Sequence, residues 1–128
     1  MSYRSMRVAE ARQQPRLKLP VMYTLVRAKP KGSQRFIWTG HVYDISATGM
    51  RLELDEAVEP GTVIEVRTML PGSVHTTFRA SGRVVRIHDD DASLPPVRVG
   101  LIFDHFVHAI DRQRLRDYLQ THGLRLAA

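Results

Sequence analysis

The chain has 128 residues, 43% of them hydrophobic, which suits one folded domain and is too short for two separate cores. It has no cysteine, which excludes disulfides and cysteine-ligated zinc, and no apolar run approaches the roughly 20 residues of a membrane span. The net charge is +6 and uneven: residues 1–35 carry nine basic residues and one acid, but residues 36–103 carry six basic and nine acidic. This basic front suggests an anionic partner, and without an apolar signal sequence we expect a cytoplasmic protein.

The N-terminal segment is predicted to lack regular structure. Residues 1–11 show no clear period, so we expect a flexible basic arm there. Pro15 lacks an amide hydrogen and pushes Gln14 towards extended geometry, so Arg12 to Arg16 should form a loop. Each guanidinium offers a planar fork of donors that matches a phosphate or a guanine edge. Two of them on an extended loop can hold a small anion from two sides.

The following segments alternate apolar and polar residues with the period that is typical of strands. The predicted strands are Leu17–Arg27, Phe36–Ile45, Gly49–Leu54, Thr62–Leu70 and Val97–Phe103, and His75–His88 should hold one long strand or two. Pro20 predicts a bend in the first of them, and Gly40 and Gly82 predict bulges. Strict alternation places Trp38, Val42 and Asp44 on one face of the second strand.

The C-terminal pattern is helical from Val107 to Thr121, and Gly123 is well placed to end the helix. The predicted apolar stripe consists of Ile110, Leu115, Tyr118 and Leu119. The predicted solvent side consists of Arg112, Arg114, Arg116, Asp117 and Gln120. Six or seven short strands followed by one helix predict a mainly β fold, a small antiparallel barrel that the helix caps.

The segment Asp44-Ile45-Ser46-Ala47-Thr48-Gly49 connects the second and third predicted strands. A hairpin turn explains two of its residues, since Ser46 can bond to the turn backbone and Gly49 can supply a positive φ. Asp44 is less well explained by a turn. Its carboxylate can accept hydrogen bonds from N1–H and N2–H of a guanine, so a turn and a ligand site stay equally open.

The two motifs, Arg12-x-x-x-Arg16 and Asp44-x-Ser46-x-x-Gly49, occur in this order before a final strand and a helix. Together they resemble the PilZ family of bacterial cyclic di-GMP receptors, over roughly residues 11–121. The resemblance implies a six-stranded antiparallel barrel with a C-terminal helix. We therefore expect a PilZ domain at 12–121, followed by a tail at 122–128.

The resemblance also implies a binding site for cyclic di-GMP. The implied ligand-binding residues are Arg12, Arg16, Asp44, Ser46 and Gly49. The arginines would grip the phosphates and the guanine Hoogsteen edges, the acid and the hydroxyl would bond a guanine, and the glycine would allow close approach. Arg86 stands where the family often has an aromatic residue, and its guanidinium can stack on a base, so it is a further candidate.

The function expected from the resemblance is a non-catalytic receptor that relays a second-messenger signal, for example in motility, biofilm or exopolysaccharide control. Its mechanism would be ligand-induced ordering of the arginine loop, and its output would need an effector protein that the sequence does not identify. No other cofactor and no membrane insertion are expected.

Two other functions stay open. One is a small basic barrel that binds nucleic acid, for which Tyr23, Phe36, Trp38 and Tyr43 supply aromatic rings. Alternation splits these rings between two faces, so core packing explains them more economically. The other is a PilZ-like adaptor that binds proteins but no nucleotide.

Enzyme and metal sites are not expected. His105 and His108 are three residues apart but lack an evident third ligand, and Asp89-Asp90-Asp91 is typical of a solvated loop. The sequence has neither a nucleophile elbow nor a phosphate-binding glycine loop.

Overall fold

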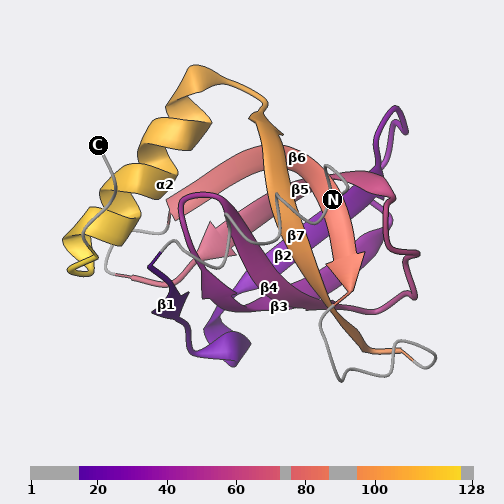
Figure 1. Ribbon diagram of the computed structural model, residues 1–128, viewed down its shortest axis with the longest axis horizontal. Coiled ribbons are helices and arrows are strands. Elements are labelled where there is room, and N and C mark those ends of the chain that lie inside the picture. The colour runs from indigo at the N-terminus through magenta and orange to yellow at the C-terminus, as the bar shows by residue number, and fades with distance from the viewer. Residues whose placement is uncertain (1–14, 73–75, 87–94, 125–128) are drawn as a thin grey trace, which may run out of the picture.

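The computed structural model describes residues 15–72, 76–86 and 95–124. Six antiparallel strands form a closed barrel, confirming the predicted fold. The strands are β2 (Leu25–Pro30), β3 (Trp38–Ile45), β4 (Gly49–Leu54), β5 (Val63–Leu70), β6 (Thr76–Arg86) and β7 (Val97–Phe106). The order around the ring is β2-β5-β6-β7-β4-β3, and β3 pairs with β2 to close it (Figure 1). Closure leaves each of the six strands with a neighbour on both sides.

The segment predicted as one strand from Leu17 to Arg27 is divided into three pieces, so that prediction was wrong. A two-residue strand β1 (Leu17–Lys18) pairs with the end of β3, a short 3-10 helix η1 (Val21–Tyr23) follows, and only then does β2 begin. Pro20 stands directly before η1, and its fixed φ and missing amide hydrogen suit the start of a helical turn better than a ladder.

Alternating apolar side chains fill the barrel. On β4 the prediction is confirmed, since Met50, Leu52 and Leu54 are buried while Arg51 is exposed. Fully buried residues on the other strands include Val26, Val42, Ile64, Val66, Phe78, Val84 and Leu101. Each belongs to a strand whose intervening residues are more polar or more exposed, which is the pattern of a sheet with one solvated face.

The bulge in β3 lies at Tyr43, and the prediction of a bulge at Gly40 was wrong. The pairing with β4 shifts between Val42 and Asp44, so one residue is inserted there. Gly40 instead allows close strand contact, because a Cβ at this position would lie 1.8 Å from the carbonyl oxygen of Glu53. The pairing of β6 with β7 is also irregular at Gly82, but the inserted residue there is Asp104 on β7, so the extra residue does not lie in β6 as predicted.

The Tyr43 bulge reverses the faces of the strand that follows it. Asp44 pairs with Arg51, and Ile45 pairs with the buried Met50. Directly opposite residues share a face of the sheet. Asp44 therefore lies on the outer face, and its predicted place beside Val42 was wrong. One inserted residue thus brings a carboxylate to the outer face of the barrel, where Asp44 is still only 9% exposed.

The C-terminal helix α2 (Ala109–Thr121) packs against β6 (Figure 1). Leu115, Tyr118 and Leu119 are buried as predicted, but Ile110 is 52% exposed. The first turn is anchored instead by Asp111, a buried acid whose two oxygens accept from the backbone amides of Arg79 and His108, both at 2.9 Å.

The predicted solvent residues of α2 are exposed or half-buried, and Gly123 follows the helix with φ +85°, as its predicted role requires. No helix in the described part of the chain is long and apolar enough to cross a membrane.

Candidate functional site

The structure brings one residue from each motif into direct contact. Nη1 of Arg16 donates to Oδ1 of Asp44 at 2.8 Å, and Nε of Arg51 lies 3.4 Å from Oδ2 of the same carboxylate. The Asp44 side chain is 13% exposed, compared with 48% for Arg51. Two guanidiniums therefore share one largely buried carboxylate on the outer face of the barrel. We call Arg16, Asp44, Ser46, Gly49 and Arg51 the turn site.

Strand register explains why these side chains meet. Lys18 of β1 and Arg51 of β4 lie on either side of Asp44 in the sheet. The row continues across β7 to Gly100, which adds no side chain, and then to Val85 on β6. Val85 and Ile102 form a small apolar cluster on this face, separate from the main core.

Ser46 and Gly49 build the turn beside Asp44. The Ser46 hydroxyl is fully buried; its oxygen accepts from the amides of Thr48 and Gly49, both at 3.2 Å, and it donates to the carbonyl of Gly49. The backbone amide of Ser46 also donates to that carbonyl, at 2.8 Å. The turn role predicted for Ser46 is therefore present in the structure.

The positive φ predicted for Gly49 is wrong. This residue does not adopt a positive φ. A Cβ at this position would instead lie 2.5 Å from the carbonyl oxygen of Leu101 on β7. Close approach of two backbones, rather than a left-handed turn conformation, excludes a side chain here.

The remaining predicted residues are not part of this cluster. Arg12 and the sequence Asp89–Asp91 lie outside the described residues. Arg86 is exposed at the end of β6 opposite Val99, whose neighbours Leu52 and Val84 point into the barrel. The register therefore places Arg86 at the rim of the barrel, on the other face from Asp44 and Arg51.

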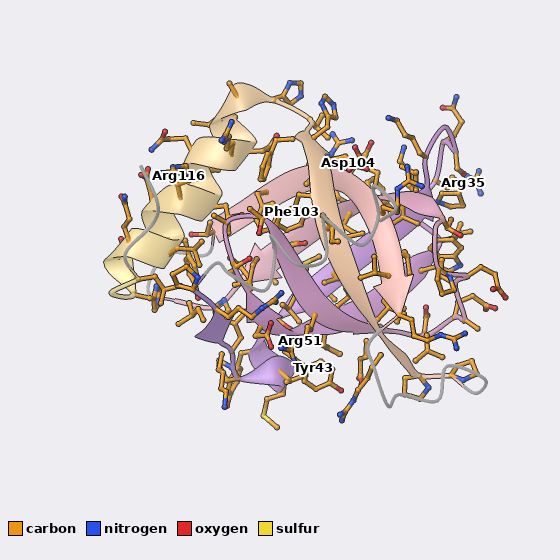
Figure 2. All side chains as sticks on the ribbon, in the orientation of Figure 1. Arg35, Tyr43, Arg51, Phe103, Asp104 and Arg116 are labelled. Atoms are coloured by element: carbon orange, nitrogen blue, oxygen red, sulfur yellow. The ribbon has the colours of Figure 1, made fainter. Side chains whose placement is uncertain are left out.

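Sequence analysis missed Arg51 and the charged contacts around Tyr43. The Tyr43 hydroxyl donates to Glu53 Oε2 at 2.5 Å and accepts from Arg98 Nε at 3.1 Å. Burial, and then the hydrogen bond to Glu53, raise the pKa of Tyr43 above 10.0. Figure 2 shows Tyr43 and Arg51 together on the β3–β4 side of the barrel, away from Arg116 on α2. The only signal for these residues was their outward position on alternating strands.

The described residues contain no group of three histidine, cysteine, aspartate or glutamate side chains that could hold a metal ion. The turn site itself brings together two guanidiniums and a carboxylate, which can recognise a ligand by charge. Its guanidiniums can bind phosphate or a guanine edge, and its carboxylate can accept from guanine donors.

Comparison with known proteins gives one family and one fold. A family model described as "PilZ domain" matches residues 10–121. Among solved structures, the chain is similar to the Bacillus subtilis inhibitor of motility (MotI/DgrA), with a TM-score of 0.60 and 23% sequence identity. The match covers 88% of this chain and 53% of that one, so this chain spans about half its length. No curated protein matches.

Proposed function

Because this chain belongs to the PilZ domain family, we propose that it is a receptor for cyclic di-GMP, which relays the signal to a partner protein and catalyses no reaction. The observation that carries this proposal is the ion pair between Arg16 and Asp44. It joins the arginine motif to the turn motif, although the two residues are 28 positions apart in the chain.

The ion pair between Arg16 and Asp44 can be replaced by contacts with a ligand that carries both anionic groups and hydrogen-bond donors. Phosphates of the dinucleotide would take the guanidinium of Arg16, and guanine donors would take the carboxylate of Asp44. Both charges thus keep a partner when the pair separates. The Arg16–Asp44 hydrogen bond and each new hydrogen bond between a charged group and the ligand contribute similar free energies, about 1.5–3 kcal/mol each. Exchange is therefore favourable once several ligand contacts form.

The proposed mechanism is ordering of the arginine loop on the barrel. Arg16 directly precedes β1, whose two residues pair with the end of β3 beside Asp44. A ligand that binds both Arg12 and Arg16 would hold the preceding chain against this wall. The surface offered to a partner would then differ between the free and bound states, as a relay requires.

Ser46, Gly49 and Arg86 have secondary roles in the proposal. The Ser46 hydroxyl must leave the Gly49 carbonyl before it can donate to guanine, so its first contribution is to hold the turn. Gly49 keeps β4 close to β7 below Arg51. Arg86 would reach the ligand only around the rim of the barrel.

Calorimetric titration with cyclic di-GMP, cyclic di-AMP and GTP tests the proposal. We expect Arg16→Ala to weaken cyclic di-GMP binding by about tenfold or more, the equivalent of one charge-assisted hydrogen bond. Arg116→Ala is the matched control, since Arg116 is an arginine on α2 away from Arg51 (Figure 2), and it should bind as the wild type does. Asp44→Ala should reduce the preference for cyclic di-GMP over cyclic di-AMP.

Each other outcome has a defined meaning. Wild-type affinity in Arg16→Ala contradicts the site. A wild-type protein that binds none of the three nucleotides supports the adaptor without nucleotide. Steeply salt-dependent binding to oligonucleotides supports the nucleic-acid alternative.

A further inference from the structure

The strands β2, β5 and β6 are neighbours in the ring, and β5 and β6 lie across it from β4 and β3. Their register places Arg27 directly opposite Arg67, and Arg67 directly opposite Arg79. We call these three residues the basic row. Neighbouring strands are about 4.8 Å apart, so the row extends for about 10 Å across one face of the sheet.

The basic row is poorly compensated. Like charges directly opposite one another destabilise a sheet. Within the described ranges, Glu65 forms an ion pair with Arg79 at 2.5 Å, and no ion pair joins Arg27 or Arg67 to a carboxylate. The Nε of Arg79 is buried and has no hydrogen-bond partner among these residues. The row therefore carries positive charge that no carboxylate in the described ranges neutralises, and the buried Nε of Arg79 adds no donor that a partner could reach.

Phe36 stabilises the row without neutralising it. The guanidiniums of Arg67 and Arg79 lie 5.0 and 5.8 Å from the centre of the Phe36 ring, and the ammonium of Lys29 lies 5.1 Å from it. Such contacts are attractive but remove no charge. They also engage the ring, which is then not a free platform on which a nucleic-acid base would stack.

We propose that the basic row is a docking surface for an acidic segment of a partner protein. Guanidinium forks bind carboxylates in pairs of parallel hydrogen bonds, and neighbouring arginines offer several such forks. Lys31 and Arg35 extend the positive surface, because both are exposed in the connection from β2 to β3, where Figure 2 shows Arg35. This surface shares no residue with the turn site, so the inference does not depend on cyclic di-GMP.

The test uses a fluorescent peptide of alternating glutamate and serine and measures its anisotropy on binding. Arg67→Glu and Arg112→Glu change the net charge equally, but only Arg67 belongs to the basic row. We expect Arg67→Glu to weaken peptide binding by about tenfold or more, because it places a like charge against the ligand, and Arg112→Glu to have little effect.

Three results would overturn the proposal: no binding of the peptide, equal weakening by both variants, or preferred binding of a single-stranded oligonucleotide through the same row. If Arg67→Glu does not fold, as judged by circular dichroism, Arg67→Gln and amide chemical shifts replace it. Peptide-induced shifts must then fall on β2, β5 and β6. Asp44→Ala should bind the peptide normally, which separates this test from that of the proposed function.

Discussion

The turn site and the basic row place the same residue type in opposite electrostatic situations. At the turn site, Arg16 and Arg51 converge on one carboxylate, Asp44. On the other wall, Arg67 lies between two further arginines across the strands. The arginine side chain does not decide which situation arises. The neighbouring side chains decide it: at the turn site both arginines contact a carboxylate, whereas in the basic row only Arg79 does, through Glu65.

Two glycine substitutions give the largest expected difference between the two sides. Gly49→Ala should lower the free energy of unfolding by about 3 kcal/mol, because its Cβ would meet a β7 backbone oxygen at 2.5 Å. Gly32→Ala, in the connection beside the basic row, should cost about 1 kcal/mol, since φ is +91° but no atom lies within 4 Å of the added carbon. Urea denaturation measures both. Equal losses would show that backbone approach does not constrain the turn site.

Added salt should change the stability of the basic row and of the turn site in opposite directions. Salt screens repulsion in the basic row, so Arg67→Gln should reduce the rise in melting temperature when sodium chloride is added. Salt also screens the attraction between Arg51 and Asp44, so Arg51→Gln should increase that rise. Thermal melts at low and high salt measure the two slopes. Slopes that shift in the same direction would contradict the contrast between the walls.

A rise to alkaline pH should give the smallest change in the free energy of unfolding. A raised folded-state pKa means that the neutral Tyr43 phenol is favoured, so its contribution to stability is complete below pH 10.0 and is lost as pH rises through the folded-state value. Tyr43→Phe should flatten this alkaline loss.

Tyr118 on α2 serves as the control for Tyr43. Burial alone raises the pKa of Tyr118. Glu53→Gln should shrink the Tyr43 effect, because Glu53 helps to raise that pKa, and should leave the Tyr118 effect unchanged. Denaturant melts between neutral and alkaline pH measure both. An unchanged Tyr43 effect in the Glu53→Gln variant would remove Glu53 as a cause.

Local patterns predicted most of the fold because alternation, turn residues and the helical stripe are properties of neighbouring residues. They failed where a distant strand decides the outcome. The Tyr43 bulge is defined by how β3 pairs with β4, and no residue within β3 indicates it. Asp111 was not predicted to be buried, because its partner is an amide on β6, 32 positions away.

The site was predictable to the extent that the motifs name its residues. They indicated that Arg16 and Asp44 belong together, and the ion pair joins them. Arg51 belongs to neither motif. The basic row depends on the register of three strands, so Arg27, Arg67 and Arg79 each look like an ordinary outward arginine in an alternating strand.

The extra residue in β3 has a consequence for anyone who transplants this surface into another protein. The strand before Tyr43 and the strand after it are out of step by one position. A graft that copies both motifs but omits Tyr43 would turn the Asp44 carboxylate towards the apolar interior of the barrel. It would also leave Ile45 facing solvent. Such a design must conserve which residues of the strand face the interior and which face solvent, as well as the motif residues themselves.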